Sequence, residues 1–216
     1  EAQEIAESAA ANKYVPGDVN LSPDGTVNSA DVMQLIDWVG EGMTYEQLYA
    51  ESPRQACAAD LTADEMIDIA DVTMDIQLSL GMQPGQVRAK RFLGHAAGDN
   101  TFTLSLVSEE NGVKRYALII NNSAAFVAGQ LDIKIGNGSE IVDVKNAGRT
   151  AAHDIYLFDG SFGAKRVLIA SMANAEIEGN GGEVIYIDVE GNGKPDVEGA
   201  IFADGNAVSY EVKKSG

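Results

Sequence analysis

The hydrophobic positions follow different periodicities in the two halves of the chain. Between residues 29 and 80 apolar side chains recur three and four residues apart, as in Val32, Leu35, Ile36 and Val39. This is the spacing of one face of an α-helix. From residue 102 onwards, short alternating or β-branched runs are separated by clusters of Gly, Asn and Asp, which is typical of strands joined by tight turns. The pattern therefore predicts a helical first part and a β-sheet second part.

The breaks between apolar runs set the helix boundaries. Gly40 and Gly42 end the first predicted helix, and Gly81 ends the last. Thr44 and Gln47 form a predicted capping box in front of the middle helix. Pro53 is expected to end that region, and the Ala- and Glu-rich stretch 1–12 fits a short additional helix. The three main helices are predicted over 29–39, 45–51 and 69–80.

The second part is predicted to form an antiparallel β-sandwich of about nine strands. No long helical pattern interrupts its apolar runs, and such a series of short strands is typical of two packed sheets. The expected fold class is multidomain α and β, with a helical module over 1–85 and a sandwich over 86–216. The predicted strands are 102–107, 115–120, 130–135, 141–144, 155–158, 167–170, 184–189, 200–203 and 208–212.

A calcium-type loop precedes the first helix. Calcium binds six to eight oxygen donors, and a twelve-residue loop wraps one ion only if the chain turns sharply at its sixth position. In residues 20–31 that position is Gly25, which tolerates a positive φ angle. The predicted ligands, with Thr26 binding through its backbone carbonyl, are Asn20, Ser22, Asp24, Thr26, Asn28 and Asp31.

A second register fits the same loop equally well. In that register Asp18 and Asn20 supply the first ligands, and the stretch 21–23 bulges out before Asp24. The sequence leaves both registers open, so Asp18 belongs to the candidate ligands.

A second copy of the loop begins forty residues after Asn20. Glu65 stands where the glycine is expected, and a positive φ at a non-glycine residue costs about 1–2 kcal/mol, so this site is expected to be weaker, distorted or empty. Its aspartates repel one another unless a cation lies between them. Val27 and Ile67, at position 8 of each loop, are expected to form a short β contact. The predicted ligands, with Met66 binding through its carbonyl, are Asp60, Thr62, Asp64, Met66, Asp68 and Asp71.

The alternative to calcium is an Asp-rich solvated loop with an N-cap aspartate. That interpretation competes seriously for the first loop alone. It is the weaker one for the pair, because both copies share a register and both lead into a helix that begins with Asp-Val.

The segments 17–32 and 59–72 resemble a dockerin. Dockerins are duplicated loop–helix modules of bacterial extracellular proteins, which bind calcium and dock onto cohesins, themselves nine-stranded β-sandwiches. The resemblance covers about residues 14–82 and is better in the first repeat, while Glu65 and the stretch 21–23 depart from the pattern. It implies cohesin contacts at loop positions 10 and 11, which are Ser29, Ala30, Ile69 and Ala70.

The second part resembles cohesins or related carbohydrate-binding sandwiches. The similarity lies in the runs 116–123 and 126–133, which match the early paired strands, and in 180–189, which matches a late glycine turn and strand. These are patterns of alternation and turns, so they are less specific than the calcium repeats.

Charge excludes some functions. The net charge is −18, and residues 1–85 hold 16 acidic side chains but only Lys13 and Arg54 as basic ones. Nucleic-acid binding is not expected, because phosphate contacts require Lys and Arg, whereas bound cations would neutralise such a module. Cys57 is the single cysteine, so no internal disulfide is expected. No run of 18 apolar residues predicts a membrane span, and no signal peptide is recognisable.

No catalytic arrangement is recognised, and an enzyme is not predicted. His95 and His153 are the only histidines, lack a nucleophile motif nearby, and are expected at the surface or at strand edges. Asp188 and Glu190 lie two apart on a strand, a pair that could be imagined in glycoside hydrolysis. Acids with this spacing are also common on solvated sheet faces.

The chain is therefore interpreted as a non-catalytic calcium-binding attachment protein, secreted or displayed at the bacterial cell surface, with a cohesin-type protein or its own sandwich as partner. The alternatives are a carbohydrate-binding module stabilised by the calcium repeats, and the non-catalytic part of a larger polysaccharide-degrading enzyme. Glycan binding predicts an exposed aromatic pair, for which Tyr156 and Phe162 are candidates. Assembly predicts an exposed apolar patch. Burial of the two modules against each other predicts a fixed structural unit.

Overall fold

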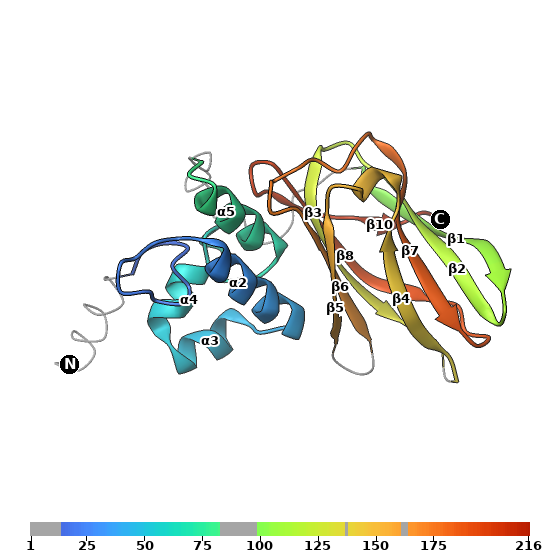
Figure 1. The fold of residues 1–216 in the computed structure, drawn as a ribbon, viewed down its shortest axis with the longest axis horizontal. Helices are drawn as coiled ribbons and strands as arrows, with labels where there is room; N and C mark the ends of the chain where they lie inside the picture. The colour runs from blue at the N-terminus through green and yellow to red at the C-terminus, as the bar shows by residue number, and fades with distance from the viewer. Residues whose placement is uncertain (1–13, 83–98, 137, 161–163) are drawn as a thin grey trace.

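The computed structural model describes residues 14–82, 99–136, 138–160 and 164–216, and it consists of a helical part beside a β-sandwich (Figure 1). The predicted stretch 1–12, His95 and Phe162 lie outside the described residues. The helices of the first part are α2 (Ser29–Glu41), α3 (Tyr45–Glu51), α4 (Pro53–Ala59) and α5 (Ile69–Ser79).

Side-chain caps begin three of these helices. Asn28 caps α2, Thr44 caps α3 and Asp68 caps α5, each in a reciprocal capping box that satisfies backbone N–H groups of the first turn. The box predicted at Thr44 and Gln47 is therefore confirmed. Gly42, with a φ of 74°, ends α2 in the left-handed conformation.

The expectation that Pro53 ends a region was wrong, because Pro53 is the first residue of α4. Proline has no backbone N–H, and the first position of a helix needs none, so it starts a helix as readily as it stops one. Ser52 in extended conformation separates α3 from α4.

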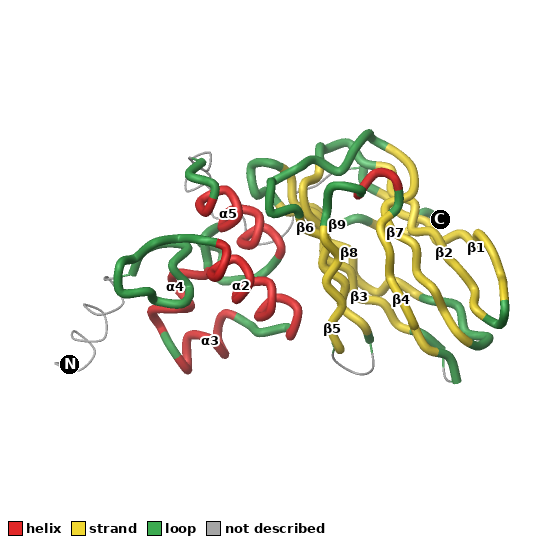
Figure 2. Tube along the Cα trace, viewed as in Figure 1, coloured by secondary structure: helices red, strands yellow, loops and turns green. Residues whose placement is uncertain are grey.

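The second part is a sandwich of two five-stranded sheets (Figure 2). One sheet has the order β10-β1-β2-β7-β4 and the other β5-β6-β3-β8-β9, and all pairs are antiparallel except β1 with β10. All nine predicted strands are present, and the short β10 is an addition. Their bounds are β1 Thr101–Glu110, β2 Val113–Asn121, β3 Phe126–Lys134, β4 Glu140–Asn146, β5 Asp154–Asp159, β6 Lys165–Ala170, β7 Gly181–Glu190, β8 Asp196–Asp204, β9 Ser209–Glu211 and β10 Lys213–Lys214, with a 3₁₀ turn, η2, at Gly148–Thr150.

The inner faces of the sheets form one hydrophobic core. Phe126 and Phe202 are fully buried in it, with ring centroids 5.1 Å apart. The ring of Phe202 lies against Gly129, and a Cβ atom added to this glycine would come within 2.3 Å of the ring. The remaining core consists mainly of branched aliphatic side chains from both sheets.

A second core joins the helices to the outer face of the β5-β6-β3-β8-β9 sheet. Leu168 and Ala170 of β6 and Val127 of β3 point out of the sandwich and are buried under the helices with residues such as Leu35 and Ile76. Every residue of α5 from Ile69 to Gln77 is buried, because this helix packs against both α2 and the sheet. The helical part therefore shares a continuous core with the sandwich.

None of the helices in the described ranges is long and apolar enough to cross a membrane.

Candidate functional site

The two calcium-type loops share a backbone conformation, and this selects one register for the first loop. Ala63 and Glu65 of the second loop have φ angles of 59° and 65°, and Leu21 and Gly25 of the first have 53° and 65°. Leu21 therefore corresponds to Ala63, and Gly25 to Glu65. Counting back, Asp18 takes the place of Asp60.

The hydrogen bonds of the closing aspartates support the same alignment. Thr62 donates its backbone N–H to Asp71 Oδ1 at 3.0 Å, and Asn20 donates to Asp31 Oδ1 at 3.1 Å. The sequence separations are 9 and 11 residues, so the first loop carries a two-residue insertion. With Leu21 matched to Ala63, the inserted residues are Ser22 and Pro23.

The later positions of the loops match without further shifts. Asp24 Oδ1 accepts the N–H of Thr26 at 3.2 Å, and Asp64 Oδ1 accepts that of Met66 at 3.0 Å. Asn28 and Asp68 cap their helices in the same way, at 2.8 and 2.7 Å from Ala30 N and Ala70 N. Asp31 and Asp71 each accept a second N–H, from Asn28 and Asp68 respectively.

The structure also bears on three expectations for these loops, which concern Ser22, the contact between Val27 and Ile67, and Glu65. The side chain of Ser22 belongs to the insertion, and its hydroxyl donates to Asp24 Oδ1 at 2.9 Å. Its N–H donates to Asp18 Oδ1 at 2.8 Å, as the N–H of Asp64 does to Asp60 Oδ1 at 3.1 Å. The β contact expected between Val27 and Ile67 is not formed, since neither of these described residues belongs to a strand or bridge. The non-glycine residue Glu65 does adopt the positive φ that its position requires.

The carboxylates of the second loop lie in an environment that opposes their charge. Burial raises the pKa of Asp60 to about 6, with a smaller contribution from the charge of Asp64. Burial, followed by the charge of Asp68, raises the pKa of Asp71 well above its usual range. A bound cation would relieve both effects, so the donor set fits a hard divalent ion such as calcium. Among the described residues, no group of three or more His, Cys, Asp or Glu side chains is arranged so that it could hold a metal ion.

The helices that leave the two loops both pack on the sandwich. Gly40 of α2 lies against Phe158 of β5, so closely that a Cβ atom would come within 2.4 Å of the ring. Arg166 of β6 forms two hydrogen bonds with Asp132 of β3, at 2.7 and 3.0 Å, and donates a third to the carbonyl oxygen of Val39 at 2.9 Å. The positive charge of Arg166 lies at the C-terminal end of α2, where it also interacts favourably with the helix dipole.

Helix α5, which leaves the second loop, makes its own contacts with the sandwich. Gln77 of α5 is 3% exposed and donates to the carbonyl of Gly205, after β8, at 2.8 Å. Leu61 of the second loop and Met74 of α5 pack on Ala207, in the turn between β8 and β9. Ile69 and Ala70 are buried in the shared core, whereas Ser29 and Ala30 are exposed. The two repeats are therefore used unequally in this contact.

None of these interface residues is evident from motif reading. Their signal in the sequence is the run Val167-Leu168-Ile169-Ala170, which is apolar at every position. Continuous apolar strands are buried on both faces, so this run indicates that something covers the outside of the sheet.

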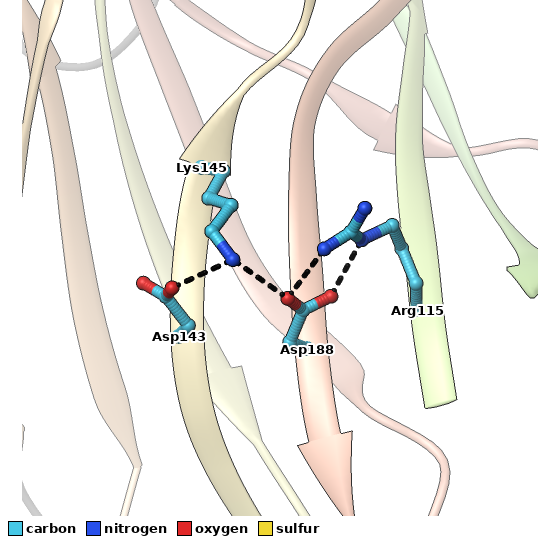
Figure 3. Close-up of polar contacts among 4 residues, drawn as sticks. All are labelled: Arg115, Asp143, Lys145 and Asp188. Atoms are coloured by element: carbon cyan, nitrogen blue, oxygen red, sulfur yellow. Dashed lines mark hydrogen bonds and ion pairs between the residues drawn. The ribbon is translucent and has the colours of Figure 1, made fainter. Parts of the chain in front are cut away.

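The residues considered for catalysis have structural positions. Asp188 is held by Arg115 at 2.7 Å and by Lys145 at 3.2 Å, and Lys145 also binds Asp143 (Figure 3). The hydrogen bond from Arg115 lowers the pKa of Asp188, so this carboxyl is a poor proton donor. His153 directly precedes the edge strand β5, but the surface position considered for it was wrong, because it is 4% exposed with Nε2 3.2 Å from the carbonyl of Val127. Burial lowers its pKa.

Comparison with known proteins gives only partial likenesses. No protein-family model and no curated protein matches the sequence. Among solved structures, a non-cellulosomal cohesin from Archaeoglobus fulgidus is similar, with 16% identity and a TM-score of 0.44, covering 54% of this chain and 86% of that one. The third ScaB cohesin of R. flavefaciens, solved in complex with a group 1 dockerin, has 9% identity and a TM-score of 0.40, covering 57% and 94%.

A chitin-binding domain of a chitinase from Pyrococcus furiosus has 8% identity and a TM-score of 0.30, covering 51% of this chain and 91% of that one. Cohesin modules are thus similar to about half of the chain. At these scores the likeness identifies neither a partner nor a ligand.

Proposed function

We propose that this chain is a non-catalytic, calcium-binding attachment protein of the bacterial cell exterior. Its helical part acts as a dockerin-like module, and its cohesin-like sandwich is the surface to which that module is attached. Calcium orders the two loops and thereby fixes the helices that leave them. The chain would then be a closed structural unit, with its own sandwich as the partner of its calcium module.

The observation that carries this proposal is the position of α2 and α5. The closing aspartate of each loop lies in the first turn of one of these helices, and together the helices lie on the outer face of one sheet. The contact combines a shared apolar core with polar contacts such as Arg166 to Val39 and Gln77 to Gly205. Permanent protein–protein interfaces are more hydrophobic than transient ones, so an apolar core of this kind fits a permanent contact.

The calcium ligands follow from the aligned loops. In the first loop they are Asp18, Asn20, Asp24, the carbonyl of Thr26, Asn28 and Asp31. In the second they are Asp60, Thr62, Asp64, the carbonyl of Met66, Asp68 and Asp71. The second site has more carboxylates but pays for the strained Glu65, so the two affinities are expected to differ.

Binding of a glycan by the sandwich has less support. Sugar-binding faces need exposed aromatic rings, and the paired rings found in the described part of the sandwich are Phe126 with Phe202 and with Tyr210, around a fully buried Phe126. Tyr156, considered for a platform, packs against the helical part, with its hydroxyl 3.9 Å from Met33 Sδ.

Calorimetric titration of the chelator-treated protein with calcium tests the loops. Two binding events of unequal affinity are expected. Saturation at about 100 times the dissociation constant stabilises a protein by roughly 2.7 kcal/mol per site, which for a chain of this size raises the unfolding temperature by on the order of 5–10 °C. The Asp18→Ala variant should weaken one event and the Asp60→Ala variant the other, whereas Asp37→Ala, outside the loops, serves as the control. No binding at millimolar calcium would refute the metal part of the proposal.

A further inference from the structure

Among the described residues, β10 alone pairs with the outer edge of β1. Strand β1 has ten residues, and β10 covers only Thr101 and Phe102 of them. The rest of this edge lies on the side of the sandwich away from the helices (Figure 1).

The hydrogen-bonding groups of this edge can be assigned from the contacts of β10. Lys213 N–H donates to the carbonyl of Asn100 at 3.0 Å, and Ser215 N–H donates to that of Phe102 at 2.8 Å. Backbone groups of alternate residues point to the same side of a strand, so those of Leu104 and Leu106 face the open edge. A bulge between Leu106 and Ser108 then interrupts the alternation.

Two apolar side chains of this edge are accessible to solvent. Leu106 is 54% exposed and Val107 is 51% exposed. No charged residue occurs before Glu109 in the strand. An open edge with apolar side chains and without charge favours pairing with another strand.

We propose that this edge pairs with the same edge of a second copy of the chain, antiparallel and about a two-fold axis at Ser105. In this register Leu104 of each copy lies opposite Leu106 of the other, and these pairs exchange hydrogen bonds. Ser105 of one copy lies opposite Ser105 of the other, and the two form a non-hydrogen-bonded pair. The β10-β1-β2-β7-β4 sheet of one copy and the same sheet of the other then form one continuous sheet.

The surroundings of the edge fit this occupant. A hollow of about 350 Å³, lined by Leu104, Pro195 and Lys214 among others, lies beside β1. The second copy's Leu106 falls on the face of the sheet where Leu104 lies, and enters this hollow. Past the bulge, the second copy's exposed Glu109 and Glu110 approach the end of β10. There Lys213 and Lys214 are 71% and 62% exposed, while each already pairs with an acid of its own chain, Glu211 and Asp196 respectively. The acidic end of one edge therefore meets the basic end of the other.

The pairing involves few residues, since β10 blocks one end and the bulge the other. A weak, concentration-dependent dimer is expected, at the small end of specific interfaces. The proposal does not depend on calcium or on the function of the helical part.

Disulfide trapping tests the register. Non-hydrogen-bonded pairs have Cα atoms about 4.5 Å apart, which is within the range of a disulfide. In a Cys57→Ser background, Ser105→Cys is expected to give covalent dimers under mild oxidation. The control is Val142→Cys on β4, at the other edge of the same sheet, where valine is 44% exposed. Equal or lower cross-linking of the Ser105→Cys variant would overturn the proposal.

Sedimentation over a range of concentrations gives the second measurement. Leu106→Lys is expected to raise the dissociation constant of the dimer at least tenfold, whereas Val142→Lys leaves it unchanged. Thermal unfolding of both variants shows whether the sandwich is intact. A wild-type chain that stays monomeric up to millimolar concentration, or a dimer indifferent to Leu106→Lys, would contradict the pairing.

Discussion

Replacement of Gly40 by leucine is expected to detach the helical part from the sandwich. The Cβ atom alone would lie within 2.4 Å of the Phe158 ring, and a leucine side chain has no space between α2 and β5. Overpacking of this kind costs about 1–3 kcal/mol. Helix propensity acts in the opposite direction, because leucine is favoured over glycine in a helix by about 1 kcal/mol at most.

The sign of the effect therefore distinguishes docking from independent modules. If α2 were free of the sheet, Gly40→Leu would stabilise the helical part or leave it unchanged. A matched control is Gly148→Leu in η2, where an added Cβ atom meets nothing within 4 Å. Thermal unfolding followed by calorimetry is expected to show a lower or split transition for Gly40→Leu only. A gain in stability at Gly40 would refute the contact.

The calcium-free protein is expected to lose stability as the pH rises from about 4 to about 8. Asp75 on α5 is fully buried, and burial, reinforced by the charge of Asp31, raises its pKa to about 8. In the unfolded chain this carboxyl has its ordinary pKa near 4. Between these values the folded state binds a proton that the unfolded state has released, so the free energy of unfolding falls with rising pH and levels off above about pH 8.

The Asp75→Asn variant isolates this contribution, because asparagine resembles the protonated acid in shape and carries no charge. Urea unfolding in chelator should give curves for wild type and variant that diverge from pH 4 to pH 8, by roughly 2–4 kcal/mol at the upper end. Part of the slope below pH 6 remains in the variant, since Asp60 titrates there as well. Parallel pH profiles for the two proteins would show that Asp75 is not protonated at neutral pH.

Asp75 also illustrates what the sequence does and does not reveal. Counted from the closing aspartate of each loop, it occupies the position of Leu35 in the first repeat, and both side chains are fully buried. The helical periodicity correctly predicted α5 but gave no reason to expect a carboxylate in its buried face. An added Cβ atom at Gly17 would lie 2.7 Å from Asp75 Oδ1, so the turn before the first loop covers this carboxylate.

The secondary structure was largely predictable because it is determined locally. A capping box located the start of α3, the calcium-type loops located those of α2 and α5, and glycine clusters separated the strands. The register of the first loop could not be predicted, because it depends on which residues adopt a positive φ angle. Leu21 does so, although leucine rarely has this conformation. The contact between α2 and β5 joins residues more than a hundred positions apart and depends on shape, which no local pattern encodes.

In the function proposed above, calcium holds the helical part on its own sandwich. A protease site introduced between residues 82 and 99 allows the two halves to be separated covalently while they remain folded together. After cleavage, size-exclusion chromatography in calcium is expected to show one complex of both fragments, and chelator is expected to release them. The Gly40→Leu variant should separate even in calcium. Fragments that elute separately in calcium, or that stay together equally well in chelator, would contradict the account.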